Sequence, residues 1–173
     1  CTTIPKGNLV GGFDVCLSTT WTAPTDWRVH DRGLSFLSSY NGVKLRIICI
    51  YAPQAGRKDV VAQQEELFAW LQSLPTSNTI LTGDFNSKMA EAGSFVNRVV
   101  ALTKGRDGWS SCFQEGGATY YGNNTTNGAY TESRIDHMVF TGPEPIASTI
   151  YLDWIPGTGH VPMSCDIVLG SLL

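Results

Sequence analysis

Two strand-like runs, residues 33–40 and 43–51, flank the dipeptide Asn41-Gly42, and this feature constrains the fold more than any other. Asn-Gly is the strongest short signal for a two-residue hairpin, because both turn positions favour a positive φ angle. The second run begins with alternating apolar and polar residues and ends continuously apolar. That pattern is typical of a central strand buried on both faces. The sequence therefore predicts a β-hairpin whose second strand lies inside a sheet.

After this hairpin, the sequence alternates between helical and extended patterns. Apolar residues at helical spacing predict a helix over residues 58–74, with Val61 beside its inner stripe and Pro75 at its end. The other expected elements are strands over 11–18, 78–82, 135–140, 146–154 and 161–169, a loop with Trp21, Pro24 and Trp27, a helix over about 92–103, and a long surface loop over 114–131 with a short strand near Tyr120. Strands outnumber helices, so we expect one α/β (α+β) domain over residues 1–173, with packed sheets and helices outside them.

Composition and charge limit the classes of function. The 173 residues are 42% hydrophobic and 16% charged, which is typical of a globular domain with a sizeable core. No apolar run approaches the ~20 residues that span a bilayer, so we expect no membrane partner. The net charge of −3 argues against a protein that coats DNA passively, because such proteins are usually basic. It argues less against a nuclease, since acidic residues hold the metal that meets the phosphate.

The cysteines give a weaker indication of the compartment. There are five, they are widely spaced, and none forms a C-x-x-C pair, which argues against a zinc ribbon. Cys16, Cys49 and Cys165 lie in apolar, strand-like runs. We therefore expect buried free thiols and a reducing compartment, nuclear or cytoplasmic.

Asp84 and Asn86 directly follow the strand expected over 78–82. They are two residues apart, so their side chains point to the same face, and Gly83 lets the backbone turn closely beside them. A carboxylate can hold Mg²⁺ and orient a water, while an amide can hold the attacking water or a phosphate oxygen. The same two residues could instead cap the loop by local hydrogen bonds, and the G-D-x-N pattern alone leaves both interpretations open.

Asp136 and His160 add a second constellation. Asp136 begins an apolar strand, and His160 follows a glycine turn at the start of another. An Asp that holds a His fixes the tautomer of the imidazole and raises its basicity, and a charged His stabilises a phosphoryl transition state. The alternative for His160 is an ordinary surface histidine. The other two histidines, His30 and His137, are expected to be structural.

The order of these motifs resembles the endonuclease/exonuclease/phosphatase superfamily, and most closely the apurinic-type endonuclease domain of non-LTR retrotransposons. The motifs are Ile50-Tyr51-Ala52-Pro53-Gln54, Gly83-Asp84-Phe85-Asn86, Ser133-Arg134-Ile135-Asp136-His137 and Gly159-His160. Together they cover nearly the whole chain. The resemblance implies two packed mixed β-sheets flanked by helices, a four-layer sandwich.

The resemblance also implies a role for each motif residue. Asp84 would hold the metal and orient or deprotonate the attacking water, and Asn86 would help to position that water. Asp136 would orient His160, which would bind the phosphate and stabilise its developing charge. Tyr51 would contact the scissile phosphate. The further substrate-binding residues implied are Gln54, Arg134 and Asn86. The cofactor would be Mg²⁺ or Mn²⁺, acting as a Lewis acid on the phosphate and the leaving oxygen.

Two positions depart from the family pattern. Family members carry an Asn and then a metal-binding Glu on strands before the segment that matches Gly11–Ser18, whereas residues 1–10 contain Asn8 but no acid. We therefore expect that the N-terminal strands are missing and that no partner carboxylate for the metal is identifiable, with Glu132 as a weak candidate. The family's last motif is Ser-Asp-His, but this chain has Thr158-Gly159-His160. Both departures predict weak Mg²⁺ binding.

Three functional hypotheses follow from the resemblance. The first is a metal-dependent phosphodiesterase that nicks DNA within a retroelement polyprotein, with a reverse transcriptase domain in the same polyprotein. The second is a catalytically impaired domain of the same fold that binds nucleic acid or protein. The third is a phospholipid or phosphoinositide phosphodiesterase or phosphatase of the same superfamily. The loop over 117–131 lies where the retroelement enzymes place a substrate hairpin, which favours nucleic acid over lipid.

Overall fold

The hairpin expected around Asn41-Gly42 forms the centre of the main sheet in the computed structural model. Its strands are β4 (Gly33–Tyr40) and β5 (Val43–Tyr51), which pair antiparallel along their whole length. Both turn residues have positive φ angles, 48° at Asn41 and 81° at Gly42, as a two-residue hairpin of this kind requires. The most constraining prediction from the sequence is therefore confirmed.

Six strands form the main sheet, in the order β3-β4-β5-β6-β10-β7. β5 and β6 run parallel, and the other neighbouring pairs are antiparallel. The strands not yet defined are β3 (Thr25–His30), β6 (Thr79–Asp84), β7 (Ser110–Ser111) and β10 (Asp136–Thr141). The structure describes residues 2–3, 13–102, 110–111, 117–123, 128–152 and 159–169.

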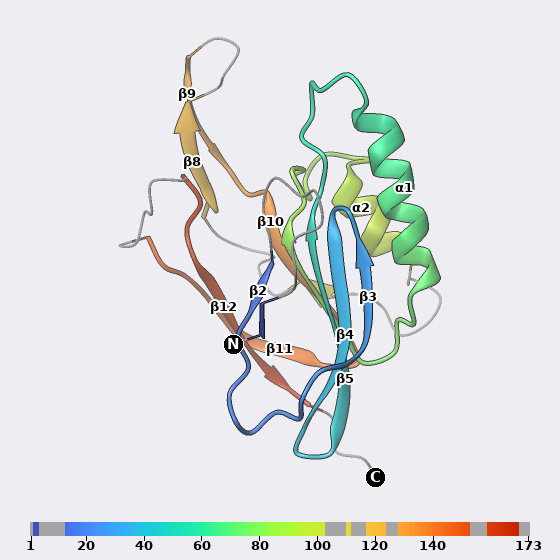
Figure 1. Ribbon diagram of the computed structural model, residues 1–173. Helices are drawn as coiled ribbons and strands as arrows, with labels where there is room; N and C mark the ends of the chain where they lie inside the picture. The colour runs from blue at the N-terminus through green and yellow to red at the C-terminus, as the bar shows by residue number, and fades with distance from the viewer. Residues whose placement is uncertain are drawn as a thin grey trace.

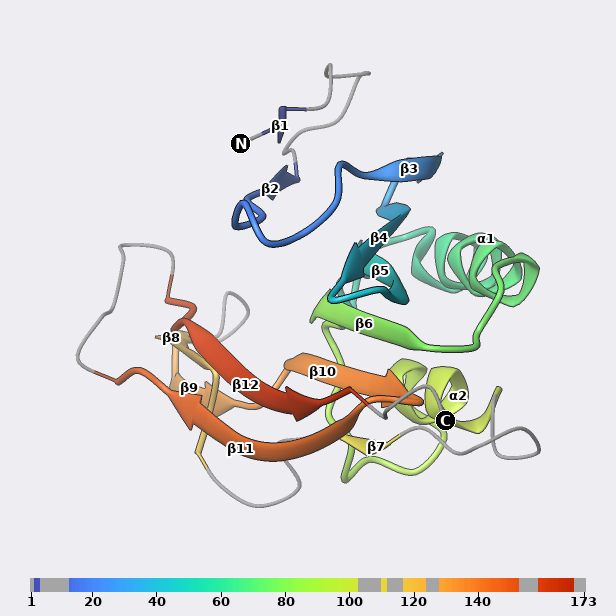
Figure 2. The same cartoon turned by 90° about the horizontal axis from the view of Figure 1, so that it is seen from below.

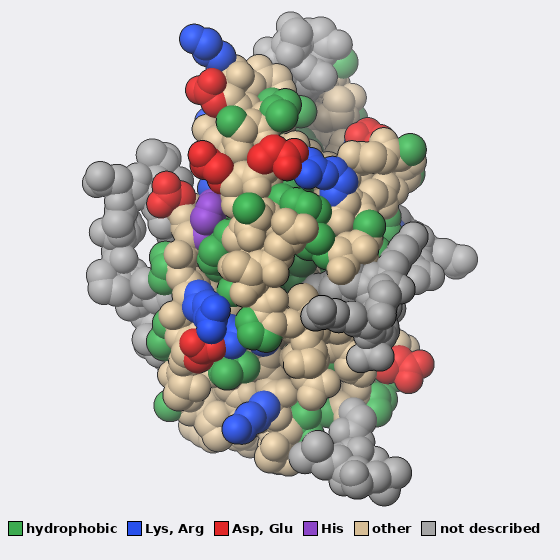
Figure 3. All heavy atoms as spheres, turned by 90° about the vertical axis from the view of Figure 1, so that its right-hand side faces the viewer, with side chains coloured by type: hydrophobic (Ala, Val, Ile, Leu, Met, Phe, Trp, Pro, Cys, Tyr) green, Lys and Arg blue, Asp and Glu red, His purple; other side chains and the backbone are tan. Residues whose placement is uncertain are grey.

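Both described helices, α1 (Val60–Ser73) and α2 (Phe95–Ala101), lie on one face of the main sheet (Figures 1 and 2). Ser94 caps α2, because its hydroxyl accepts a hydrogen bond from the Asn97 backbone N–H. The apolar cluster between these helices and the sheet consists of Ile48, Ile50, Ala52, Leu67, Leu71, Leu74, Leu81, Phe85, Phe95, Val96, Val99 and Val139. The prediction for Val61 is wrong, since its side chain is 68% exposed. The side of the molecule that carries α1 shows interspersed acidic and basic side chains (Figure 3).

The opposite face of the main sheet is covered by short strand pairs (Figure 2). These are β1 (Thr2–Thr3) with β2 (Asp14–Val15), β8 (Tyr120–Asn123) with β9 (Tyr130–Ser133), and β11 (Glu144–Ile150) with β12 (Met163–Val168). The molecule is thus an α+β fold of mixed sheets with two helices, as expected. Because both helices lie on the same face, the described residues supply three of the four expected layers. No helix in the described part of the chain is long and apolar enough to cross a membrane.

Several local expectations differ from the structure. Residues 25–30 form strand β3 rather than a loop. The short strand expected near Tyr120 is confirmed as β8, and it pairs with the unexpected strand β9. Strand β2 is shorter than the strand expected over 11–18, of which residues 11 and 12 lie outside the described residues. Cys16 is exposed rather than buried, because the chain leaves the sheet beside it.

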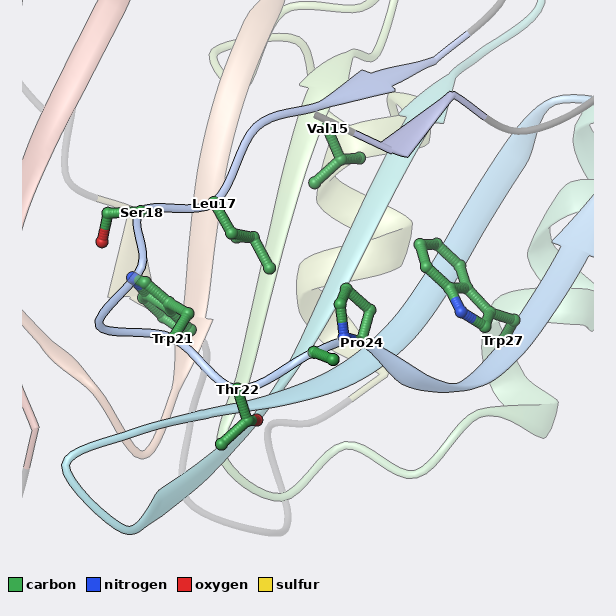
Figure 4. Close-up of a pocket in the computed structure, with 8 residues that line it drawn as sticks. Val15, Leu17, Ser18, Trp21, Thr22, Pro24 and Trp27 are labelled. Carbon is green, nitrogen blue, oxygen red and sulfur yellow. The ribbon is translucent and has the colours of Figure 1, made fainter.

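A cavity of about 300 Å³ lies between β2 and β3. It is lined by Val15, Leu17, Ser18, Trp21, Thr22, Ala23, Pro24 and Trp27, several of whose side chains converge in Figure 4. None of the residues expected at the functional site lines it, so the site must be sought elsewhere in the fold.

Candidate active site

Gly83 and Asp84 end strand β6 at a point where the backbones of β5 and β6 approach closely. Gly83 has a φ angle of 139°, and a Cβ atom there would collide with the carbonyl oxygen of Ile50. Only glycine fits this position. The backbone beyond it is anchored from two sides, because Ala52 N–H donates to the Asp84 carbonyl at 2.8 Å and Phe85 N–H donates to the Ile135 carbonyl at 2.8 Å. The Asp84 carboxylate is therefore held on a rigid part of the sheet.

Asp84, Asp136 and His160 come together from three separate segments. Asp84 and Asp136 are direct partners in the antiparallel pairing of β6 with β10. His160 Nδ1 lies 3.0 and 3.3 Å from the two carboxylate oxygens of Asp136, so the imidazole donates this hydrogen bond. Its other nitrogen, Nε2, lies 4.0 Å from Asp84 Oδ2. The structure thus brings together three of the residues that the sequence singled out.

His160 is fixed by backbone contacts with strand β8. Tyr121 N–H donates to the Gly159 carbonyl at 2.7 Å, and Val161 N–H donates to the Thr119 carbonyl at 2.9 Å. The Tyr120 ring packs edge-on against the imidazole, with ring centroids 4.9 Å apart. Such packing limits the rotation of the imidazole and keeps Nε2 directed towards Asp84.

The electrostatics of the cluster suit acid–base chemistry near neutral pH. Burial and, to a smaller extent, the nearby Asp136 carboxylate raise the pKa of Asp84 to about 6, against the opposing effects of the Asn86 backbone N–H and the His160 charge. The hydrogen bond from Asp136 raises the pKa of His160, against an opposing effect of burial. Asp84 can therefore gain or lose a proton near pH 6, while His160 keeps its charge to a higher pH than an ordinary histidine.

Asn86 serves the loop as well as the site. Its backbone N–H donates to Asp84 Oδ1 at 2.7 Å, and its side-chain Nδ2 donates to the Ala52 carbonyl at 2.8 Å. It has a positive φ angle of 46°, which asparagine tolerates better than most residues. The local hydrogen bonds that the sequence left as an alternative are thus present, and they also orient the Asp84 carboxylate.

The remaining predicted site residues lie at the same edge of the main sheet. Tyr51 is the parallel-strand partner of Asp84 at the end of β5, and its side chain is 45% exposed. Gln54 is exposed in the loop after β5, and Arg134 is half-buried just before β10. Their contacts with substrate stay predictions.

His137 and His30 have structural surroundings, as expected. His137 is buried, its Nε2 lies 2.9 Å from the Ser87 carbonyl, and its ring packs edge-on against Phe85. Burial lowers its pKa, so the ring is a neutral donor to that carbonyl. The ring of His30 packs on Trp70, with centroids 5.4 Å apart.

The sequence reasoning missed the part played by Thr119. This residue is fully buried, and its hydroxyl oxygen accepts from Ile135 N–H at 3.2 Å and Asp136 N–H at 3.1 Å. It therefore connects the segment of His160 to the strand of Asp136. No periodicity marks Thr119, because it lies in a stretch rich in glycine and tyrosine.

The donor set fits a divalent cation held mainly by Asp84. One ligand atom from each of Asp84, Asp136 and His160 lies within 4.8 Å of the others, and among the described residues no further His, Cys, Asp or Glu joins a group of three. Glu132 is therefore not a partner ligand. Both oxygens of Asp136 face His160, and Asp84 Oδ1 accepts from Asn86, so Asp84 Oδ2 is the oxygen best placed for a cation. Mg²⁺ suits such a site because it keeps several waters and uses few carboxylates.

Solved structures of other proteins share the fold that carries this site. The endonuclease domain of TRAS1, a telomere-specific non-LTR retrotransposon, superposes with a TM-score of 0.55 at 14% identity, covering 82% of this chain and 65% of that one. TDP2 of D. rerio, complexed with a single-strand DNA product, gives 0.53 at 16% identity, covering 77% and 60%. The mannosyl-6-phosphatase Bt3783 of Bacteroides thetaiotaomicron gives 0.56 at 17% identity, covering 79% and 56%. The chain thus spans less than two thirds of each of these structures.

Sequence comparison gives the family. No curated protein sequence matches the chain. A model of the Endonuclease/Exonuclease/phosphatase family matches residues 9–158, which is most of the 173 residues and includes every predicted site residue except His160. The chain belongs to the endonuclease/exonuclease/phosphatase family.

Proposed function

We propose that this chain is a metal-dependent phosphodiesterase that nicks DNA. The observation that carries the proposal is the arrangement of Asp84 and His160 across a 4.0 Å gap, with Asp136 hydrogen-bonded behind the imidazole. A carboxylate and a charged imidazole that face one another can act on an attacking water and on a phosphate in the same step.

The residues divide the reaction between them. Asp84, oriented by the Asn86 N–H, accepts the proton of the water whose oxygen attacks phosphorus. The P–O bond to the leaving sugar oxygen breaks, and charged His160 stabilises the negative charge on the phosphoryl oxygens. Asp136 holds the Nδ1–H of His160 and so presents Nε2 to the phosphate. A Mg²⁺ or Mn²⁺ ion held by Asp84 would supply Lewis-acid polarisation of the phosphate and stabilise the leaving oxygen.

DNA is the substrate that the comparisons favour. Two of the similar structures are a retrotransposon endonuclease domain and a protein complexed with single-strand DNA. We extend the proposal to a domain of a retroelement polyprotein that also carries a reverse transcriptase, working in the nucleus or cytoplasm. One feature of this chain also supports DNA as the substrate. The β8–β9 pair projects from the end of the molecule where β5 and β6 end (Figure 1).

Nicking of supercoiled plasmid DNA in Mg²⁺ tests the proposal. We expect Asp84→Asn to lower the nicking rate by roughly 100-fold or more, because the proton acceptor is lost while the shape is kept. Asp166→Asn, at an exposed carboxylate on β12, is the matched control and should nick like the wild type. Nicking by the wild-type chain that is no faster than nicking by Asp84→Asn would exclude the proposed activity.

Two other functions remain distinguishable by the same preparation. A binding module without catalysis is favoured by the single well-placed metal ligand, and it would retain DNA binding while nicking no faster than Asp84→Asn. A phosphatase is favoured by the similarity to the mannosyl-6-phosphatase. It would release inorganic phosphate from a sugar or inositol phosphate in Mg²⁺ and leave the plasmid intact.

A further inference from the structure

Arg32 lies in the turn between β3 and β4, at the edge of the sheet that carries the catalytic cluster. Its carbonyl accepts a hydrogen bond from Tyr51 N–H at 3.0 Å, so the two residues are neighbours across the strands. Tyr51 is in turn the partner of Asp84, and Asp84 is the partner of Asp136. The four residues therefore form a row along one end of the main sheet, with Arg32 at one end and the catalytic carboxylates at the other.

The guanidinium of Arg32 is held in place before any ligand binds. Its Nη2 donates to Gln63 Oε1 on α1 at 2.7 Å, and its Cζ lies 5.8 Å from the centre of the Tyr51 ring. The backbone N–H of Arg32 donates to His30 Nδ1 at 3.1 Å, which fixes the turn itself. An arginine restrained in this way loses little side-chain entropy when it binds an anion.

The hydrogen bond of Arg32 to Gln63 does not neutralise its positive charge. Two other arginines differ in this respect, because Arg46 forms an ion pair with Asp26 and Arg98 forms one with Glu65. The described hydrogen-bond partner of the Arg32 guanidinium is instead a neutral amide, which uses only one of the five N–H donors of the group. Near the two catalytic carboxylates, such a cation offsets the repulsion that an approaching phosphate strand would meet.

We propose that Arg32, positioned by Gln63 and Tyr51, binds a backbone phosphate of DNA beside the scissile one. Neighbouring strands lie about 4.8 Å apart, so two strand steps place the Arg32 backbone roughly 10 Å from Asp84. That separation suits a neighbouring phosphate of the same strand. The proposal rests on the proposed function, since it names a second contact with the same substrate.

Salt-dependent binding of a short DNA duplex tests this contact without catalysis. Fluorescence anisotropy in EDTA would compare the wild-type chain with Arg32→Gln and with Lys44→Gln at several salt concentrations. Lys44 is exposed near the opposite end of β5, so its variant removes the same charge far from the site. We expect Arg32→Gln to weaken binding about 5- to 10-fold and to reduce the slope of log K against log salt by about 0.9, and Lys44→Gln to change neither.

Two further variants separate binding from folding. Arg32→Lys keeps the charge, so it should keep the salt slope while losing part of the affinity that depends on the planar guanidinium. Gln63→Ala should likewise keep the slope and weaken binding less than Arg32→Gln, because only the positioning contact is lost. If Arg32→Gln unfolds, the charge can be removed from the DNA instead, with a duplex that carries one neutral methylphosphonate beside the nicking site. The wild-type chain should then bind this duplex with a slope of log K against log salt that is smaller by about 0.9.

The outcomes distinguish this inference from the proposed function. If the wild-type chain binds and nicks DNA but Arg32→Gln matches Lys44→Gln in affinity and slope, the Arg32 contact is wrong and the function stands. The same holds if the methylphosphonate leaves the slope of the wild-type chain unchanged. If the wild-type chain neither binds nor nicks DNA, both proposals fail together.

Discussion

At the scale of single residues, the buried carboxyl of Asp84 links the chemistry of the site to the stability of the fold. Burial raises the pKa of Asp84 to about 6, whereas an aspartate in an unfolded chain titrates near pH 3.9. A group whose pKa rises on folding contributes stability that is complete below its unfolded pKa and is lost as the pH rises through its folded pKa. Above pH 6 the charged, buried carboxylate therefore costs stability, which is acceptable at a catalytic position.

This linkage predicts that Asp84→Asn stabilises the metal-free chain at pH 8 and not at pH 4. The expected gain at pH 8 is about 2–3 kcal/mol, because a pKa change of two pH units corresponds to ~2.7 kcal/mol. Urea unfolding in EDTA at both pH values measures the gain, with Asp166→Asn as the control that should show none. An equal gain at both pH values would contradict the linkage.

Gly159 shows why a missing motif residue cannot simply be restored. The family pattern has an acid at this position, but here Gly159 has a φ angle of 80°, and a Cβ atom would lie 2.6 Å from the Tyr121 carbonyl oxygen. The contact between this backbone and β8 positions His160, as the hydrogen bond from Tyr121 N–H shows. Gly159 therefore lacks the acidic ligand of the family pattern, but its backbone conformation also helps to position His160.

At the scale of elements, three segments meet at the buried residue Thr119. Thr119 precedes β8, its carbonyl binds the segment after His160, and its Oγ1 accepts from Ile135 N–H and Asp136 N–H. The distance between Asp136 and His160 thus depends on a residue that contacts neither side chain through a described hydrogen bond.

We expect Thr119→Val to destabilise the fold by about 2 kcal/mol, because two buried backbone N–H groups lose their acceptor while the side-chain volume is kept. Thr119→Ser keeps the hydroxyl and should cost less than half as much. Urea unfolding gives the stabilities. Plasmid nicking should show a reduced maximal rate for Thr119→Val that Thr119→Ser restores. Equal effects of the two substitutions on stability would show that packing, and not the hydroxyl, matters.

The elements also show what could be predicted from the sequence. The β4–β5 hairpin, α1 and β6 follow from local signals, namely a turn dipeptide and apolar periodicity. Strand β3 does not, because it depends on contacts distant in sequence: Trp27 packs on Phe36 with ring centroids 4.8 Å apart, and Asp26 pairs with Arg46. Its outer side chains are mostly polar or exposed, so its pattern resembles that of a loop.

The sequence identified which residues form the candidate site, but it did not give the distances between them. The order of motifs identified Asp84, Asp136 and His160, since each lies at the end or the beginning of a recognisable strand or after a turn. Their mutual distances depend on strand register and on the backbone contacts of β8, which no local pattern encodes. Arg32 was missed for the same reason, because the proposed role depends on its place in the β3–β4 turn beside Tyr51.

At the scale of the whole molecule, the two faces of the main sheet are covered unequally. On β5, Ile48 and Ile50 are buried beneath the helices, whereas Ile47 and Cys49 on the other face are only half-buried. The β11–β12 pair lies on that second face and, among the described residues, pairs with no further strand. Within the described part of the chain, the outer edges of this pair therefore carry no further strand.

The exposed apolar side chains of the β11–β12 pair predict that the chain associates with itself in solution. Ile146 on β11 is 66% exposed, and Tyr151, Leu152 and Val168 nearby are also exposed. A lysine on such an edge repels a second strand. We expect Ile146→Lys to lower the fraction of dimers and larger species, with a change in stability within about 0.5 kcal/mol, as is usual for a surface substitution.

Sedimentation velocity over a concentration series measures this effect, and Val61→Lys is the matched control. The side chain of Val61 is 68% exposed, a fraction similar to the 66% of Ile146. Val61 lies on α1, away from any strand edge. Both variants exchange an exposed aliphatic side chain for a positive charge, so a general effect of charge on solubility would change them equally. Association through the hairpin requires that only Ile146→Lys dissociates. A wild-type chain that stays monomeric at every concentration would show that the outer edges of β11 and β12 do not pair with a second copy.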